Sequence, residues 1–515
     1  MTNGVSRPLV RAPIFALLAT AAAVVQAQTE SAPTGGSAGP RALTIVPTLT
    51  ATTTLTDNVN LSTDDRRADL ITQISPGISV TSNTRRVKGY LNYSVSALVY
   101  ASESSNNEIQ HALNAAATVE AVEDWAFVDV RGVVSQELVS AFGTQSRESG
   151  AVNSNRTQVA TYSVSPYVRG RIGDLATYDV RLTYQGSSGG ESSTYDASTY
   201  EARARVAGAT ALRSVGWAVD ATRQAFQNDT AGTSRTDRLR ASVSYAVTPE
   251  FQVSITGGRE SEDISGLGSQ SFTTSGWGFN WIPTERTRVS ASREKRFFGN
   301  SHAYTLEHRT PRTVWRYNDN RDLTSGFSQF RLSRGTAYDL LFEQFASRYP
   351  DPVERDARVT EALQRSGTPP NSPALTGSLA AATLVQRRQE FAFAWLGVRD
   401  TLTVSIAQGQ GQRADRVVVV TDDFANGNRV TQRGISVSLG HRLTPISAVS
   451  ITANSQRSTG TVDTRTSRLD TVALAWSGSF GARTTGSIAA RHTRSGGSAT
   501  NYTESALTAT FSMQF

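Results

Sequence analysis

From about residue 42 to the end, the chain alternates between apolar and polar positions with a period of two. In the segment 238–247 one set of positions holds Leu239, Ala241, Val243, Tyr245 and Val247, and the other holds Arg238, Arg240, Ser242 and Ser244. Successive side chains of a β-strand point to opposite faces, so each such segment has one apolar and one polar face. The pattern predicts an all-β protein.

The connections between these segments favour a barrel over a soluble sandwich. Short turns, at 122–124, 173–174, 248–250 and 444–446, alternate with long polar loops at 57–69, 142–156, 186–198 and 260–270. Outer-membrane barrels have short periplasmic turns and long external loops. In hydrocarbon a sheet must close so that every backbone group is paired. We therefore expect one closed antiparallel transmembrane β-barrel over residues 42–515, with about 22 strands (range about 16–24) and an even count.

The beginning of the chain has the features of an export signal. Arg7 and Arg11 precede a short apolar run at 13–25, and Ala27 ends a small-residue cleavage motif. We expect residues 1–27 to be a signal peptide and residues 28–41, rich in Ser, Thr, Gly and Pro, to be a flexible leader. The chain contains no cysteine, which excludes a lipid-anchored cysteine and disulfides. These features predict the outer membrane of a Gram-negative cell as the location.

Two further features concern the membrane. Tyr and Trp residues near predicted strand ends are expected in aromatic girdles at the membrane surface, namely Tyr90, Tyr93, Trp125, Trp217, Trp281 and Trp315. The last strand places Leu507, Phe511, Met513 and Phe515 on one face. An alternating final strand that ends in Phe resembles the signal read by the barrel-assembly machinery. We therefore expect outer-membrane lipid and that machinery as partners.

The alternation fades between residues 323 and 384, which we interpret as an insertion. Within it, residues 338–365 look helical, with an apolar stripe of Leu340, Leu341, Phe345 and Ala346, and the sequence YPDP at 349–352 interrupts them. Long insertions between strands are usually functional or disordered. Two alternatives remain open: the insertion constricts the lumen or caps a mouth, or it is a small helical decoration outside the barrel.

The net charge of +7 is carried almost entirely by arginine. The arginines are dispersed among acidic residues, so nucleic-acid binding is not expected. Candidate lumen residues, by their position on polar faces, are Arg169, Arg171, Arg203, Arg205, Arg238 and Arg240. Arginine binds carboxylate, sulfate and phosphate groups, so a ring of them would favour anionic polymers. Alternatively, pairing with acidic residues such as Glu201 and Asp220 braces the wall, and we favour this second interpretation.

No pattern of catalytic or metal-binding residues emerges. The five histidines have no zinc-like spacing, and Asp57, Asp64 and Asp65 lack the full pattern of a calcium loop. GSSGG at 186–190 matches G-x-S-x-G, but in a predicted loop rather than between a strand and a helix. The chain is expected not to be an enzyme and to need no cofactor or metal.

Six stretches together carry a family resemblance: TDNVNL at 56–61, DLITQISPGI at 69–78, YSVSPY at 162–167, RFFGN at 296–300, HRTPRTVW at 308–315 and YPDP at 349–352. As an ordered set they resemble PEP-CTERM system-associated outer-membrane proteins, which occur with exosortase and exopolysaccharide gene clusters. The resemblance implies a channel or scaffold for exopolysaccharide export, with polysaccharide as a possible cargo. The alternative functions are a structural or adhesive barrel that acts through its external loops and, as a third hypothesis, an outer-membrane hydrolase.

Overall fold

The computed structural model describes residues 42–148, 150–189, 196–210, 212, 214–228, 232–264, 268–324, 337–346, 349, 352–366, 374–380, 383–414, 422–425, 429–462 and 464–515. The expected signal peptide (1–27) and leader (28–41) lie outside the described residues. Leu43–Phe515 forms one compact unit, and the description below concerns this unit.

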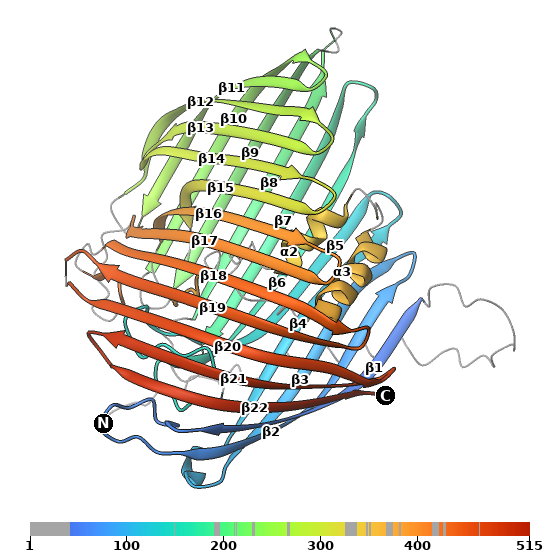
Figure 1. Ribbon diagram of the computed structural model, residues 1–515. Coiled ribbons are helices and arrows are strands. Elements are labelled where there is room, and N and C mark those ends of the chain that lie inside the picture. Colours follow the sequence, from blue (N-terminus) through green and yellow to red (C-terminus); the bar gives the residue numbers. More distant parts are fainter. Residues whose placement is uncertain are drawn as a thin grey trace, which may run out of the picture. The chain divides into compact units, whose positions relative to one another are not determined.

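Twenty-two strands in the described residues form a single sheet (Figure 1). Their bounds are β1 Leu43–Thr56, β2 Asp69–Asn83, β3 Val87–Tyr100, β4 Glu108–Val122, β5 Ala126–Leu138, β6 Arg156–Ile172, β7 Ala176–Gly189, β8 Ala197–Ala209, β9 Val215–Asn228, β10 Gly232–Thr248, β11 Phe251–Ile264, β12 Gln270–Thr284, β13 Thr287–Arg296, β14 Gly299–Arg309, β15 Thr313–Thr324, β16 Leu384–Leu396, β17 Asp400–Arg413, β18 Arg429–Thr444, β19 Ser447–Gly460, β20 Thr466–Gly481, β21 Thr484–Gly497 and β22 Tyr502–Gln514. Each strand pairs antiparallel with its neighbours in sequence, and β1 pairs with β22, so the sheet closes. The predicted closed barrel of about 22 strands is confirmed.

The seam between the first and last strands carries a ladder of hydroxyl groups on one face. Thr50 contacts Ser512 at 3.0 Å, Thr52 contacts Thr510 at 3.2 Å, and Thr54 contacts Thr508 at 3.1 Å. The hydroxyl of Thr56 donates to Glu504 at 3.0 Å and completes the series. Side-chain hydrogen bonds between directly opposed residues stabilise antiparallel pairs, so this ladder fixes the register in which the barrel closes.

The two faces of the wall differ as the alternation predicts. On β10, Leu239, Val243 and Tyr245 are about half exposed on the outer face, while Arg238 and Arg240 lie on the inner face beside Asp220 of β9. The same outer face continues around the barrel and forms an apolar exterior, as a lipid-facing surface requires. Trp217, Trp281 and Trp315 share this outer face with apolar partners.

One of the predicted girdle residues is misplaced. The register of β3 puts Tyr90 on the same face as Asn92 and Ser94, which line an internal cavity. The prediction failed because β3 has tyrosines at both parities, and only the odd-numbered Tyr93 faces outward beside Leu113.

The lengths of the connections distinguish the two ends of the barrel. At the end where β1 begins and β22 ends, turns range from two residues between β10 and β11 to five between β8 and β9, and all four predicted short turns lie there. The other end carries the long connections, of which residues 325–383, between β15 and β16, are the longest. By the rule for outer-membrane barrels, the short-turn end is periplasmic and the long-loop end is extracellular.

Two predicted loops are shorter than expected. β7 continues to Gly189 and β8 begins at Ala197, so the ordered hairpin takes up part of the predicted loop 186–198. Likewise β11 continues to Ile264 inside the predicted loop 260–270. Alternation alone does not reveal these polar extensions, because beyond the membrane both faces of a strand contact water.

Helices are few. The described helices are η1 (Ser104–Asn106) between β3 and β4, and α2 (Ala337–Phe345) and α3 (Pro352–Ser366) between β15 and β16. Among the residues that the structure describes, no helix is both long and apolar enough to cross a bilayer.

Candidate functional site: the lumen and the segments folded into it

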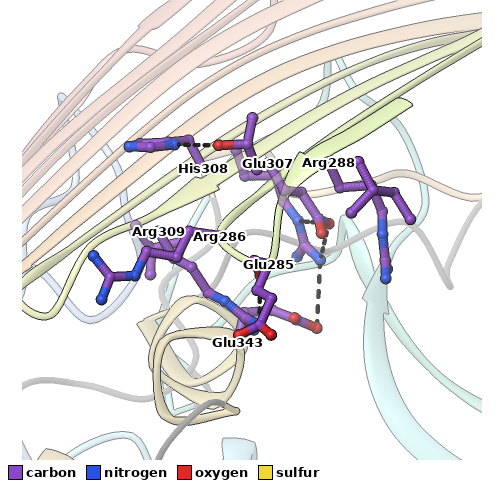
Figure 2. Close-up of a pocket in the computed structure, with 11 residues that line it drawn as sticks. Glu285, Arg286, Arg288, Glu307, His308, Arg309 and Glu343 are labelled. Atoms are coloured by element: carbon purple, nitrogen blue, oxygen red, sulfur yellow. Dashed lines mark hydrogen bonds and ion pairs between the residues drawn. The ribbon is translucent and has the colours of Figure 1, made fainter. Parts of the chain in front are cut away.

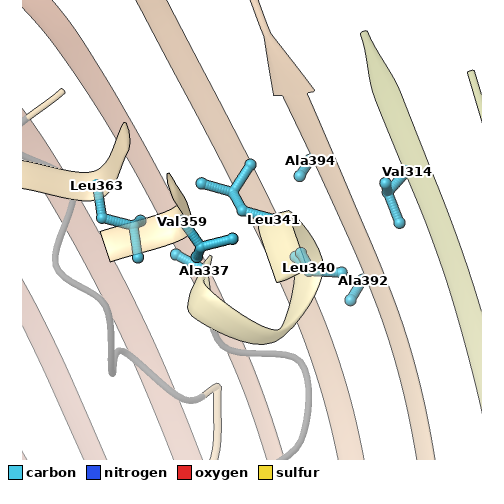
Figure 3. Close-up of a cluster of buried hydrophobic side chains, with 8 residues drawn as sticks. All are labelled: Val314, Ala337, Leu340, Leu341, Val359, Leu363, Ala392 and Ala394. Atoms are coloured by element: carbon cyan, nitrogen blue, oxygen red, sulfur yellow. The ribbon is translucent and has the colours of Figure 1, made fainter. Parts of the chain in front are cut away.

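Helix α2 packs against the inner face of the barrel wall. Leu340 and Leu341 are almost completely buried, and they contact Val314 of β15 and Ala392 and Ala394 of β16 (Figure 3). These wall residues lie on the face opposite the exposed ring of Trp315. Figure 1 shows both helices within the ring of strands. Of the two alternatives left open by the sequence, the structure therefore places the helices of the insertion inside the lumen.

The local sequence of β16 explains this placement. In Phe391–Trp395 the outward positions are aromatic, but the inward positions are alanines rather than polar residues, and both alanines are fully buried. A strand that is apolar on both faces buries both of them. Because alanine is small, the helix can approach the wall closely. This signal is present in the sequence and indicates a covered inner wall, although the alternation alone does not single it out.

The two helices hold each other. The hydroxyl of Tyr338 donates a hydrogen bond to the carboxylate of Asp356, and the guanidinium of Arg355 lies 4.8 Å from the centre of the Phe342 ring. Val359 and Leu363 of α3 complete the buried cluster. Burial, together with the Asp356 carboxylate, raises the pKa of Tyr338.

The insertion reaches the periplasmic end of the lumen. The side-chain amide of Gln344 lies 3.5 Å from the carbonyl of Pro311, which belongs to a short periplasmic turn. Glu343 lies 3.7 Å from Arg316, which also pairs with Glu307 at 3.0 Å. A small cavity of about 70 Å³ lies at this junction. Figure 2 shows the charged side chains of the strand ends and Glu343, which line it.

From there the chain returns across the lumen towards the extracellular end. Gln456 of β19 holds the backbone of Thr376 on both sides, accepting its N–H at 2.9 Å and donating to its carbonyl at 3.2 Å. Three residues later, the N–H of Leu379 donates to the carbonyl of Leu138, at the end of β5, at 2.9 Å. Residues 374–380 thus connect the wall at β19 with the wall at β5.

Gly434 of β18 makes this crossing possible. A Cβ added there would lie 1.9 Å from the carbonyl oxygen of Ala374. Real Cβ atoms do not approach an oxygen so closely, so any larger residue must displace the crossing segment. Gly434 therefore belongs to the docking surface of the insertion.

The loop between β5 and β6 also folds inward, which corrects the prediction that residues 142–156 form a long polar external loop. Phe142 is 3% exposed and packs with Leu384, Phe424 and Val430. At its far side Glu148 pairs with Arg491 of β21. The hydroxyl of Tyr100 donates to the Gly150 carbonyl at 2.9 Å.

The polar groups of this loop are satisfied internally, which is why it can be buried. Asn155 donates to the carbonyls of Ser140 and Thr144, and its own oxygen accepts the N–H of Ser140 at 2.9 Å. Buried backbone groups need such partners. A loop composed largely of polar residues can therefore cover the extracellular mouth, and composition alone does not reveal this.

Four of the six candidate lumen arginines converge on two acids. Asp220 of β9 lies 2.9 Å from Arg205, 3.4 Å from Arg240 and 3.8 Å from Arg203. Glu294 of β13 pairs with Arg238 and lies 3.6 Å from Arg240. These four arginines lie on the inner face, and each has one of the two carboxylates within 4 Å, which favours bracing of the wall over a free anion-binding ring.

The other two candidate lumen arginines, Arg169 and Arg171, do not pair with these acids. Arg169 lies on the inner face with its guanidinium 4.4 Å from the centre of the Phe127 ring. Arg171 lies near the periplasmic end of β6, 3.8 Å from Asp174 of the following turn, with a side chain that is 74% exposed. It lies at the mouth of the barrel rather than in the middle of its wall.

A second ionic cluster was not predicted. Arg296 of β13 contacts both Glu260 of β11 and Asp322 of β15, and Glu260 is completely buried. Glu260 and Arg296 fall on the inner faces of their strands, so parity alone places them in the lumen. Their pairing requires the register across three strands, which the sequence does not give.

Two parts of the lumen remain hollow. One cavity of about 810 Å³ is bounded by β1 to β5, and its wall includes Thr48, Thr50, Ser75 and Ser96. Another, of about 610 Å³, is bounded by β8 to β14 and includes Arg205, Arg240, Ser242 and Ser254. Most of the polar side chains that line these cavities are hydroxyl groups, which both donate and accept hydrogen bonds and suit polar cargo.

Among the described residues, no group of three or more His, Asp or Glu side chains could hold a metal ion. Gly186–Gly189 lies within β7 rather than in a loop, and Gly190 lies outside the described residues. His302 and His441 pair with Asp319 and Asp400, at 3.0 and 2.7 Å.

The four residues of the expected assembly signal lie at the seam. Leu507, Phe511 and Met513 face Leu55, Ala51 and Leu49 across the β1–β22 pair, and the rings of Phe511 and Phe515 are about half exposed. The N–H of Phe515 donates to the carbonyl of Pro47 at 3.0 Å. Their recognition by the assembly machinery stays a prediction.

Together, the closed ring, the apolar exterior and the charged, partly filled interior define an outer-membrane β-barrel protein. No family model matches the chain, and no curated protein matches it.

Several solved structures are similar to the chain at low identity. The siderophore receptor PirA from Pseudomonas aeruginosa is 9% identical, with 92% of this chain and 80% of that chain covered and a TM-score of 0.39. The FrpB iron transporter from Neisseria meningitidis is 8% identical, with 91% and 81% covered and a TM-score of 0.45. A loop-deletion mutant of OmpT, an outer membrane protein of Vibrio cholerae, is 9% identical, with 92% and 100% covered and a TM-score of 0.31. These likenesses concern the barrel architecture alone.

Proposed function

We propose that the protein is an outer-membrane channel for a polar polymer, held closed at rest by its own insertion. One observation carries this proposal: the segment between β15 and β16 contacts the periplasmic turn at Pro311, crosses to Leu138, and packs on the inner wall between them. A decoration that served only the exterior would not occupy the lumen. Docked as it is, the insertion obstructs passage.

Exopolysaccharide is the cargo that we propose. Both cavities are lined by hydroxyl and amide groups, which exchange hydrogen bonds with sugar hydroxyls. The arginines of this part of the wall are held by shared carboxylates rather than left free, and they add to a polar lumen lining. The resemblance to PEP-CTERM system-associated proteins supports the same cargo. The proposed role is passive transport, without catalysis or a cofactor.

The structure weakens the case for an adhesive barrel in one respect. The loop at 139–155, which would be a main adhesive element, has its apolar side chains buried in the lumen mouth rather than presented outward. A binding role for it would first require its release. We therefore rank the channel above the adhesive alternative.

The test is conductance in planar bilayers, with the purified protein and with a variant in which residues 325–383 are replaced by a short Gly/Ser linker. We expect the parent protein to be nearly silent and the variant to give stable conductance steps. Heat-modifiable gel mobility would confirm that both barrels are folded. A folded variant that stays silent would rule out the channel.

The cargo is tested separately in cells. Deletion of the gene should abolish surface polysaccharide, and the full-length protein should restore it. If the deletion leaves surface polysaccharide unchanged while the linker variant conducts ions, the channel stands and the proposed cargo is wrong.

A further inference from the structure

On the outer wall, three arginines of neighbouring strands lie directly beside one another. The register places Arg433 of β18 directly opposite Arg457 of β19, and Arg457 directly opposite Arg468 of β20. We call these three residues the arginine row. All three are exposed, on the same face as Ile435 and Val472, and thus on the outside of the barrel. Arg494 of β21, opposite Asp470, extends the row by one strand.

Such an arrangement is unfavourable unless something anionic neutralises it. Directly opposed residues of antiparallel strands have Cβ atoms about 5 Å apart, and like charges there destabilise the pair. Asp470 is the single acidic residue in the sequences of β18 to β21. It pairs with Arg468 at 2.7 Å. Within the described part of the chain, Arg457 and Arg494 have no ion-pair partner, and Arg433 donates to the neutral Gln408 at 2.9 Å.

The arginine row lies at one level along the barrel axis. On the periplasmic side of it the same outer face becomes apolar, with Ile435, Ile451, Val472 and Leu474 each about half exposed. On the other side of it come the extracellular loops at 461–465 and 498–501. The arginines therefore sit where the hydrocarbon of the outer leaflet meets its headgroups. Basic residues at that boundary bind anionic headgroups.

We infer that the arginine row, with Arg494, binds the phosphate groups of a phosphorylated glycolipid in the outer leaflet. Arginine offers two parallel N–H donors to a phosphate, so adjacent guanidinium groups on three strands can hold one or two phosphates. The apolar residues beside the row hold the acyl chains of the same molecule. The ligand would thus replace the acidic partners that the wall lacks.

Binding is tested with the full-length protein in detergent and with lipid A in two forms, phosphorylated and dephosphorylated. Native mass spectrometry counts the lipid retained on each barrel. We expect the phosphorylated form to be retained and the dephosphorylated form to be lost. The triple variant R433Q/R457Q/R468Q should bind phosphorylated lipid A about a hundredfold more weakly, as expected on loss of three basic residues beside an anionic lipid.

The matched control is R86Q/R399Q/R483Q, which removes the same charge from exposed arginines of periplasmic turns. It should bind as the parent does. Heat-modifiable mobility establishes that each barrel is folded, and R433K/R457K/R468K, which keeps the charge but loses the planar fork, should bind with intermediate strength. Equal retention of both lipid forms, an equal loss in the control, or full displacement by millimolar inorganic phosphate would overturn the proposal.

Discussion

The two halves of the inner wall differ in what lies against them. One half is covered by the insertion, and the other faces a cavity. The wall from β15 to β19 is covered: the insertion packs on it where the inward residues are small, at Ala392, Ala394 and Gly434. The wall from β8 to β14 faces a cavity and carries charged residues joined through Asp220 and Glu294. Small residues leave room for the insertion to pack on the wall as a second layer. Where the wall has no second layer, cross-strand ion pairs stiffen it. Opening the lumen should therefore involve the covered half alone.

The largest effect is expected from substitutions that release α2 from the inner wall. In L340D/L341D, two fully buried leucines become carboxylates, which should weaken docking by about 5 kcal/mol or more because apolar contact is lost and charge is buried. We expect conductance to rise to the level of the linker variant. Trypsin should then cleave α3 at Arg355 or Arg358. The matched control L340M/L341M should stay closed, and a closed L340D/L341D barrel would contradict the assignment of α2 as the obstruction.

On the open wall, D220N removes the acid shared by three arginines. We expect the barrel to lose about 3 kcal/mol or less, because the arginines keep a third to a half of their exposure. In the linker variant, the same substitution should shift the reversal potential in asymmetric KCl towards anion selectivity. R171Q at the mouth should leave stability unchanged. Unchanged selectivity in D220N would show that the cavity beside it lies outside the ion path.

A smaller effect is expected from G434V. The added side chain meets the carbonyl of Ala374, so residues 374–380 must shift, at about 2 kcal/mol. Brief openings should appear in bilayer recordings. The control G257V adds the same side chain where nothing lies within 4 Å of the Cβ position. Recordings of G434V as quiet as those of G257V would mean that the crossing segment does not govern closure.

The mildest perturbation is Q456A. It removes two hydrogen bonds to the backbone of Thr376, each contributing about 1 kcal/mol. We expect faster hydrogen exchange at Thr376, with no change in the conductance of the resting barrel. Protection of Thr376 that equals the parent's would show that Gln456 does not hold the crossing.

The barrel was predictable because its signals are local. Alternation at 238–247, short turns such as 248–250 and the apolar final strand each depend on adjacent residues, and together they gave the closed sheet and its strand number. The position of the helices depended on a subtler local feature, the alanines at 392 and 394 behind an outward aromatic row. Read as a strand that is apolar on both faces, they point to a covered inner wall.

The remaining features could not be predicted because they depend on register across distant strands. Asp220 gathers arginines from β8 and β10, and the loop at 139–155 meets Arg491 more than 300 residues away in the chain. A shift of one residue in any pairing would exchange inward and outward side chains and dissolve these contacts. Parity gave the face of each arginine but not its partner. The arginine row on the exterior likewise becomes visible only when β18, β19 and β20 are aligned.

The hydroxyl ladder between β1 and β22 has a consequence for biogenesis. Its four contacts join residues separated by more than 440 positions in sequence, so none of them can form until the whole sheet has been laid down. These hydrogen bonds form only when each threonine of β1 meets its partner in β22. The last step of folding is therefore an all-or-none closure of the barrel. A chain whose first and last strands meet in the wrong register would remain an open sheet and be degraded by proteases.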